Sequence, residues 1–291
     1  MTRRPTTFVH LTDLHLNAPR TLDPTLLSDT TATLRRSLAA IGRMAPAPDF
    51  VVISGDLTNN GDVPAYQALR AELADLCARV PVIMGLGNHD SRAGYRAVFA
   101  GGDGPDDRPL DHHGAVAGVH VIVMDSAVPG RVGGDWEAGQ MAWLAEALTA
   151  HPDLPKLLVV HHPPMLDPER EQDQWASLTA GATEALRAAL AGHAVAGILC
   201  GHIHSDRVSH WHGIPVYVGA GHHAETDPLD LSTGMSMTDG AGLAIGTLRD
   251  SGLTMTYVAH PRSGRVLRRL EFGPFHEYLA RTGQGAGAVE A

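Results

Sequence analysis

Five short stretches of the chain carry side chains that can bind a metal ion or move a proton. In residues 85–90, the amide oxygen of Asn88 is a potential metal ligand and the imidazole of His89 can carry a proton. These residues follow an apolar run, residues 80–84, that is typical of a buried strand, so both side chains should emerge at its carboxyl end, where open α/β sheets bind ligands. On its own, an Asn-His-Asp sequence is more often a polar turn between a strand and a helix, so a site here depends on the other four stretches.

The other four stretches also follow predicted strands. Within the pairs Asp13/His15 and His202/His204, the alternation of side chains along an extended chain would place both polar groups on one side. A carboxylate and an imidazole one residue apart suit a single divalent ion, although an exposed polar strand end has the same pattern. The stretches are Asp13 and His15 after residues 8–12, Asp56 after residues 50–53, His161 and His162 after residues 157–160, and His202 and His204 after residues 198–200.

Together these stretches hold more ligands than one metal ion needs. Two carboxylates, four imidazoles and one amide oxygen suggest two ions, with one carboxylate shared between them. Nitrogen and oxygen ligands without a thiolate suit Mn, Fe or Zn, and the sequence does not choose among these metals. The seven predicted ligands are Asp13, His15, Asp56, Asn88, His161, His202 and His204.

Alternating strand and helix patterns predict an α/β arrangement for most of the chain. Apolar residues at helical spacing predict the helices, and Asp62 followed by Pro64 is typical of a helix N-terminus. Near the C-terminus, strands without long helices between them suggest an antiparallel second sheet. The predicted helices cover residues 24–44, 62–76, 91–99, 136–148 and 183–190, and the later strands cover residues 208–211, 215–218, 243–248, 255–258 and 266–270.

Three loops and the C-terminus have the composition of exposed chain. Residues 129–135 contain three glycines and could cover a site, and residues 101–108 are expected at the surface. Residues 219–234 are long enough to reach over a site, but a solvated loop explains their composition equally well. The Gly/Ala-rich end, from about residue 283, is expected to be disordered.

Composition places the chain among ordinary globular proteins. Its 291 residues are 44% apolar and 19% charged, enough for one sizeable core. The net charge of -10 disfavours long nucleic acids and favours small substrates. Cys77 and Cys200 both lie in apolar segments and are expected as buried free thiols, which suggests a reducing compartment. No apolar run resembles a signal peptide or a membrane span, so we expect a cytoplasmic protein.

Taken in order, the five stretches resemble the calcineurin-like metallophosphoesterases. That family's pattern of D-x-H, G-D, G-N-H-[DE], a single His and G-H-x-H is met in full from Asp13 to His204. The resemblance implies an α/β fold, a four-layer αββα sandwich of two mixed sheets flanked by helices. The implied domain covers residues 1–272, and residues 273–291 form a C-terminal helix and tail.

The resemblance also implies a mechanism and a role for each residue. A hydroxide bound at the metals would attack the phosphorus of a phosphodiester. His89 would protonate the leaving alkoxide, with Asp90 as a candidate orienting partner. His162 would support its neighbour His161 rather than catalyse. Carried over by resemblance, one metal takes Asp13, His15, Asp56 and His204, the other takes Asp56, Asn88, His161 and His202, and Asn88, His89 and His204 contact the substrate.

Within the family, the chain is most similar to the bacterial class III cyclic-nucleotide phosphodiesterases. The similarity lies in the His-His-Pro-Pro turn, the Gly-Asn-His-Asp ending and the helix with Gln140, Trp143 and Leu144. The expected substrate is 3',5'-cyclic AMP or GMP. Members that hydrolyse glycerophosphodiesters, or many diesters, share the metal ligands, so these alternatives stay open.

Other functions on this fold are disfavoured. A non-catalytic scaffold is a remote alternative, because the ligand set is complete. The region around Asp62 lacks the V-D-R-G run of the protein serine/threonine phosphatases, and the acidic charge disfavours nucleases that grip duplex backbones. A homo-oligomer is compatible with the sequence.

Overall fold

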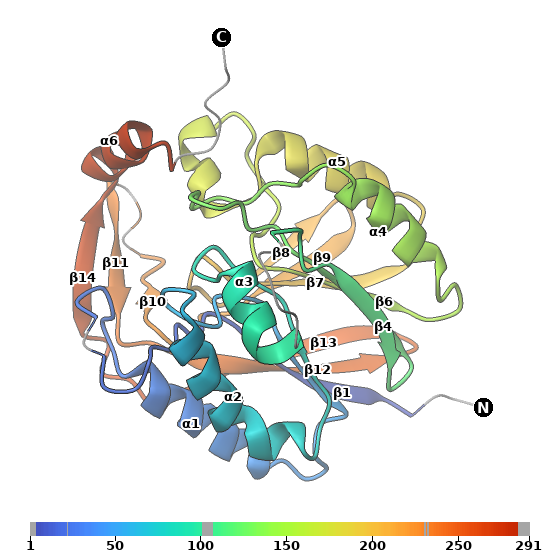
Figure 1. Ribbon diagram of the computed structural model, residues 1–291. Coiled ribbons are helices and arrows are strands. Elements are labelled where there is room, and N and C mark those ends of the chain that lie inside the picture. The colour runs from blue at the N-terminus through green and yellow to red at the C-terminus, as the bar shows by residue number, and fades with distance from the viewer. Residues whose placement is uncertain (1–3, 22, 101–106, 230, 232, 285–291) are drawn as a thin grey trace.

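Two large sheets lie face to face, and helices cover the outer face of each (Figure 1). The computed structural model describes residues 4–21, 23–100, 107–229, 231 and 233–284. Helices α1 (Thr30–Gly42) and α2 (Val63–Cys77) cover one sheet, and α4 (Gln140–Thr149) and α5 (Ala180–Leu190) cover the other. This layer order is the four-layer αββα sandwich expected from the resemblance.

The first sheet has five strands in the order β13-β12-β1-β2-β3. Its parallel part carries the first three predicted site stretches, and two later strands extend it antiparallel beside β1. β3 is an edge strand and only half-buried, whereas the sequence predicted a buried one. The strands are β1 (Thr6–Leu11), β2 (Phe50–Ile53), β3 (Val82–Met84), β12 (Gly242–Arg249) and β13 (Gly252–Ala259).

The second sheet has six strands in the order β4-β5-β6-β7-β9-β8. The four central strands are parallel, and the edge strands β4 and β8 are antiparallel to their neighbours. The strands are β4 (His112–Val116), β5 (Val119–Met124), β6 (Lys156–Val160), β7 (Val195–Cys200), β8 (Arg207–Trp211) and β9 (Ile214–Val218).

Three apolar layers hold the sandwich together. Between the sheets, Phe8 stacks on Phe50 with ring centroids 5.1 Å apart and packs in one cluster with Val121. A second cluster joins α1 and α2 to the outer face of the first sheet, and a third joins α4 and α5 to the second. Strands such as β2 and β5 are buried along their whole length because they face an apolar layer on both sides, which explains their unbroken apolar sequences.

The prediction of one antiparallel sheet near the C-terminus was wrong. Strands β8 and β9 join the second sheet, and β12 and β13 join the first. A third sheet of three strands, β10-β11-β14, stands beside the sandwich with α6 (Phe272–Thr282) at its end (Figure 1). Periodicity identifies a strand but does not say which sheet edge it will join. The strands of this third sheet are β10 (Glu225–Thr226), β11 (Gly234–Thr238) and β14 (Val266–Glu271).

Local signals explain where the helices begin. Asp29 and Asp62 accept hydrogen bonds from Ala32 N and Ala65 N, at 2.9 and 2.8 Å, and so cap α1 and α2. The helix predicted from residue 24 therefore starts only at residue 30. The helix predicted from residue 136 starts at residue 140, because Gly139 has a left-handed backbone with φ 92°. The short helices are α3 (Arg92–Tyr95), a π-turn (Arg96–Ala100) and a 3-10 turn (Glu171–Ala176).

Several smaller predictions have mixed outcomes. Cys200 is buried, but Cys77 is exposed on α2, so the prediction of two buried thiols holds for one. β4 and β11 were not predicted. Residues 101–106 of the predicted surface loop, and residues 285–291 of the tail, lie outside the described residues, and the domain limits stay a prediction. Over the described ranges, no helix is long and apolar enough to cross a membrane.

Candidate metal centre

The five predicted stretches meet where the carboxyl ends of β1, β2, β3, β6 and β7 come together. The backbone joins them directly, since Asp13 N donates to Gly55 O at 3.0 Å and His15 N donates to Asp56 O at 2.9 Å. Across the two sheets, the amide of His202 donates to both carboxylate oxygens of Asp13, at 3.0 and 3.1 Å. Asp13 and His202 are thus close enough to share one site, as the sequence analysis expected.

The paired residues converge for a different reason from the one that alternation suggested. β1 ends at Leu11 and β7 at Cys200, so the D-x-H and H-x-H pairs lie beyond the strands. Five predicted ligands have left-handed backbones, a conformation that costs roughly 1–2 kcal/mol for a residue with a side chain. Such strain gathers at functional sites, because the surrounding fold must enforce it. The five are Asp13 (φ 49°), His15 (φ 44°), Asp56 (φ 48°), His202 (φ 74°) and His204 (φ 47°).

Two buried carboxylates lie among the imidazoles. Asp56 Oδ2 is 3.3 Å from His161 Nε2 and 3.5 Å from His15 Nε2, and Asp13 Oδ1 is 3.3 Å from His204 Nε2. Potential ligand atoms within 4.8 Å of one another form several groups, and Asp56 belongs to two of them, one with Asp13 and His161 and one with His15 and His89. Asp56 therefore lies within reach of potential ligand atoms from both groups.

Ring nitrogens turned away from the centre are held by carbonyl or amide oxygens. His161 Nδ1 donates to Ser54 O at 3.1 Å, and His204 Nδ1 donates to Ala224 O at 2.9 Å, because a carbonyl can only accept. Both rings therefore present an unprotonated Nε2 when neutral. Metal-binding histidines are commonly oriented in this way. The two remaining contacts are His15 Nδ1 to Asn59 Oδ1 at 3.1 Å and His202 Nε2 to Trp175 O at 2.6 Å.

Unsatisfied atoms at the centre fit a bound cation. Asn88 Oδ1 and His161 Nε2 are buried without a hydrogen-bond partner in the described part of the chain. A buried acceptor without a donor is costly, and a metal ion would satisfy both atoms. A Cβ added at Gly87 would overlap the Asp56 carboxylate, and one at Gly201 would overlap that of Asp13, so the glycines leave room for the cluster. The residues present therefore fit divalent metal ions.

Electrostatics keep the carboxylates ionised. Burial acts to raise the pKa of Asp13 and Asp56, but the facing imidazoles, His204 for Asp13 and His161 for Asp56, hold both pKa values below their usual range. Burial would lower the pKa of His161, yet the carboxylates of Asp56 and Asp13 raise it to about 9. Burial lowers the pKa of His202 to about 4, which keeps that ring in the neutral form that binds metals.

His89 lies at the edge of the centre, and its orienting partner differs from the expected one. Its Nδ1 donates to the backbone oxygen of Asn59 at 2.9 Å, which leaves Nε2 available to a substrate. Asp90 accepts hydrogen bonds from Leu57 N and Gly87 N instead, at 2.9 and 3.0 Å. The suggestion that Asp90 orients His89 was therefore wrong. Asp90 joins the loop after β2 to the loop after β3.

His162 has both ring nitrogens in hydrogen bonds. Its Nδ1 is 2.8 Å from Ser126 Oγ, and its Nε2 donates to Val132 O at 3.0 Å. This arrangement fits the supporting role predicted from the sequence. It also fastens residues 129–135, the loop whose composition suggests a cover for the site, to the strand end after β6.

Two residues beside the cluster were missed as site residues. Asn59 orients both His15 and His89, through its side chain and its backbone oxygen. His223 lies in the loop of residues 219–234, with its ring centroid 5.0 Å from that of His15, and its Nε2 accepts from Leu27 N at 2.9 Å. Part of this loop therefore reaches the site. The His-His pair at residues 222–223 was the only sequence signal.

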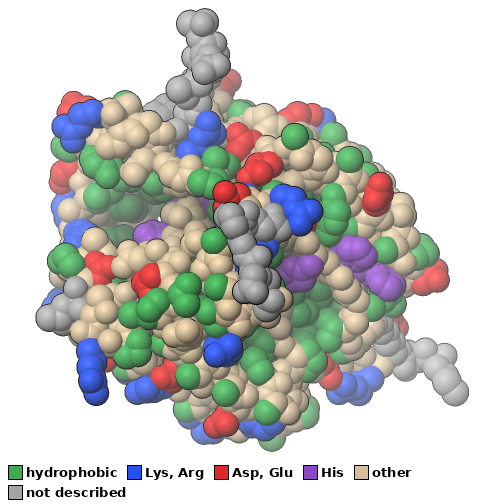
Figure 2. Space-filling model, in the orientation of Figure 1, with side chains coloured by type: hydrophobic (Ala, Val, Ile, Leu, Met, Phe, Trp, Pro, Cys, Tyr) green, Lys and Arg blue, Asp and Glu red, His purple; other side chains and the backbone are tan. Residues whose placement is uncertain are grey.

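A large cavity of about 690 Å³ opens beside the cluster. Figure 2 shows the hollow below α6, with histidine at its floor. One wall carries predicted ligands, and the opposite wall comes from the 3-10 turn, the third sheet and the start of α6. The Nε1 of Trp175 in this lining is buried without a hydrogen-bond partner among the described residues. The apolar lining includes Leu27, Trp175, Ile203, Met235, Met237, Leu270 and Phe272.

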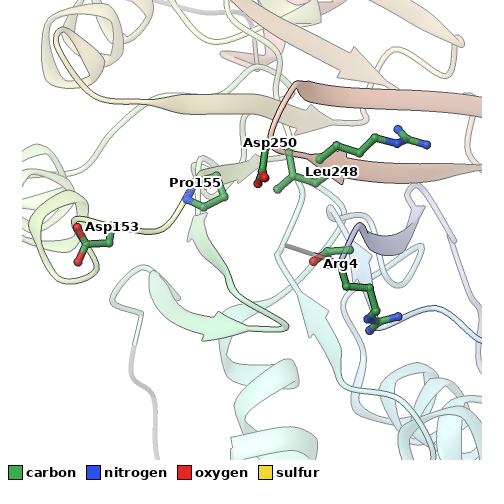
Figure 3. A pocket seen from close by; sticks show the side chains of 7 residues that line it. Arg4, Asp153, Pro155, Leu248 and Asp250 are labelled. Carbon is green, nitrogen blue, oxygen red and sulfur yellow. The ribbon is translucent and has the colours of Figure 1, made fainter. Parts of the chain in front are cut away.

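A second cavity, of about 290 Å³, offers no comparable chemistry. It lies near the amino ends of β1 and β6, and its lining includes Arg4, Asp153, Pro155 and Asp250. Figure 3 shows that the charged ends of Arg4 and Asp153 point away from each other rather than into one site. None of its lining residues belongs to a metal-competent cluster found in the described ranges.

Comparisons with known proteins show which family the chain resembles. Residues 6–206 match the family model described as calcineurin-like phosphoesterase. A probable cyclic nucleotide phosphodiesterase from Rhodococcus erythropolis is 34% identical, covering 75% of this chain and 71% of the relative. A cAMP/cGMP dual specificity phosphodiesterase from Mycobacterium tuberculosis is 31% identical, covering 80% and 72%. A probable glycerophosphodiester phosphodiesterase from Arcobacter nitrofigilis is 27% identical, covering 73% and 77%.

Proposed function

The chain belongs to the calcineurin-like phosphoesterase family, and from this premise we propose that it is a dinuclear metal-dependent phosphodiesterase that hydrolyses a 3',5'-cyclic nucleotide to the nucleoside monophosphate. The observation that carries the proposal is the position of the ligand cluster on one wall of a large apolar cavity. The cluster offers a place for the phosphate, and the cavity offers a place for the nucleoside.

The division of the ligands between two ion positions is the one that the family resemblance implies. We assign Asp13, His15, Asp56 and His204 to one ion, and Asp56, Asn88, His161 and His202 to the other. When bound, the ions would supply Lewis-acid stabilisation of the phosphoryl oxygens and a water molecule acidic enough to attack near neutral pH. Mn, Fe and Zn all suit this mixture of nitrogen and oxygen ligands.

The protein's own contribution to bond breaking is assigned to His89. Its Nδ1 donates a hydrogen bond to the backbone oxygen of Asn59. When the ring is protonated, its Nε2 therefore carries the proton that can pass to the leaving alkoxide. Because its orienting partner is the Asn59 backbone, the ring keeps its direction without a neighbouring carboxylate.

The apolar wall supports a cyclic nucleotide over a glycerophosphodiester. A purine base has an aromatic face and polar edges. Trp175 offers a large apolar ring, and its Nε1–H, which has no partner in the part of the chain that the structure describes, is available to a base acceptor. Glycerol and ethanolamine groups have little apolar surface to bury against this wall. The higher identities to relatives named cyclic nucleotide phosphodiesterases point the same way. A cytoplasmic location would suit this substrate and stays a prediction.

Steady-state kinetics with Mn²⁺ test the proposal. We expect kcat/KM to be highest for cyclic AMP or cyclic GMP, compared with glycerophosphoethanolamine, bis(4-nitrophenyl) phosphate and 4-nitrophenyl phosphate. If glycerophosphoethanolamine exceeds both cyclic nucleotides tenfold, equivalent to about 1.4 kcal/mol of transition-state binding, the protein is a glycerophosphodiesterase instead. If none of the substrates is turned over by fully metal-loaded protein, the scaffold alternative replaces both.

A further inference from the structure

A second group of histidines lies at the opposite end of the second sheet. His113 on β4, His120 on β5 and His151 in the turn after α4 each offer a ring nitrogen, and these atoms all lie within 4.8 Å of one another. His120 is four residues, or roughly 13 Å of extended strand, from Met124, the end of β5 that faces the metal centre. Histidine side chains are visible between α4 and β4 in Figure 2. This group is therefore separate from the site described above.

The rings are arranged to converge. His113 Nδ1 and His120 Nε2 are 3.1 Å apart, and the ring centroids of His120 and His151 are 4.7 Å apart. Two nitrogens bound to one zinc ion at about 2.0–2.1 Å in tetrahedral geometry would lie about 3.4 Å apart, so a small adjustment would admit the ion.

The chemistry of the group also suits a cation. His120 is fully buried, and the nitrogen that it turns toward His113 Nδ1 is its Nε2, at 3.1 Å. Burial, followed by the neighbouring His151 and His113, lowers the pKa of His120 to about 4, so its ring is neutral and able to coordinate. Lys156 is the one cation that influences this ring electrostatically among the described residues, and its Nζ is directed to the backbone oxygens of His151 and Leu154, at 3.4 and 3.3 Å.

We propose that His113, His120 and His151 form an additional binding site for a divalent transition-metal ion of the zinc class. Three imidazoles are a ligand set that zinc, copper and nickel prefer, and the exposed side of His113 leaves a coordination position open to water. The bound ion adds a side-chain link between the β4–β5 hairpin and the turn between α4 and β6, which are also joined by the hydrogen bond from His120 N to Pro155 O at 3.0 Å. Because the ion binds the folded chain and not the unfolded one, it stabilises the fold.

Zinc stoichiometry of the full-length protein tests this site. Wild type saturated with Zn²⁺ and desalted should carry one more zinc per chain than His113→Ala, measured by mass spectrometry of the metal. The exposed His113 is chosen because replacing the buried His120 could disturb folding. His112→Ala is the matched control, since His112 is an exposed histidine beside the group and not part of it. Equal zinc content in wild type and His113→Ala overturns the proposal. An equal loss of zinc in His113→Ala and His112→Ala also overturns it.

Two further measurements separate the site from catalysis. Added Zn²⁺ should raise the melting temperature of wild type more than that of His113→Ala, while kcat/KM for the phosphodiester stays the same in both. Ni²⁺ should quench Trp143, whose ring centroid lies 5.7 Å from that of His113, in wild type but not in His113→Ala or Trp143→Phe. If the thermal shift and the quenching are the same in wild type and His113→Ala, no ion binds here.

Discussion

At the residue scale, the role of His89 can be distinguished by mutation from the role of the metal ligands around it. Its backbone N donates to Asp56 Oδ1 at 2.9 Å, and this bond survives in His89→Ala. We therefore expect the variant to keep its metal content and to lose roughly 10²- to 10⁴-fold in kcat on cyclic AMP. The loss should be smaller on bis(4-nitrophenyl) phosphate, whose leaving group needs little protonation. Equal losses on the two substrates would rule out the general-acid role.

Asp56 and Asn88 provide a second contrast among single residues. Asp56 lies within reach of ligand atoms on both sides of the centre, whereas Asn88 offers one neutral oxygen. Asp56→Ala should therefore abolish binding of both ions, and Asn88→Ala should weaken one and leave the other. Metal content after dialysis at a fixed Mn²⁺ concentration is the measurement. Equal retention in the two variants would show that Asp56 does not bridge.

At the scale of elements, the sequence predicted the strands that carry the site residues but not the turns that orient their side chains. Apolar runs followed by polar residues were sufficient to identify the ends of β1, β2, β3, β6 and β7. The left-handed turns at Asp13 and His202 were not predictable from side-chain alternation, because contacts between strands far apart in sequence impose them. The third sheet was missed for a similar reason, since no local pattern specifies that β11 pairs with β14.

The third sheet and the 3-10 turn support a prediction about substrate choice. Trp175 lines the cavity, and its backbone oxygen, not its side chain, holds His202. Trp175→Ala should therefore keep the metals and raise KM for cyclic AMP by about tenfold, with a smaller change for the non-nucleotide bis(4-nitrophenyl) phosphate. Leu229→Ala is a suitable control because Leu229 is 93% exposed and is not part of the cavity lining. Equal changes for both substrates would show that the ring does not contact the base.

At the scale of the whole molecule, the apolar layer between the two sheets contains a buried histidine. His10 follows Phe8 on the same face of β1, is 2% exposed, and has its Nε2 2.8 Å from Ser54 Oγ. Burial lowers the pKa of His10 to about 4, although the charge of Asp13 acts to raise it. The sandwich therefore holds this ring neutral in a layer that both sheets need for their packing.

Acid should therefore weaken the sandwich through His10. Between about pH 6.5 and pH 4 the unfolded chain binds a proton at this residue and the folded chain does not, so its contribution to stability is lost as the pH falls through this window. The expected loss at pH 5 is on the order of 2 kcal/mol. His10→Gln keeps a polar atom for Ser54 but cannot titrate, so metal-free variant protein should lose less stability than wild type between pH 7 and pH 5. Urea unfolding at both pH values measures the difference, and parallel losses would mean that His10 ionises without cost in the folded protein.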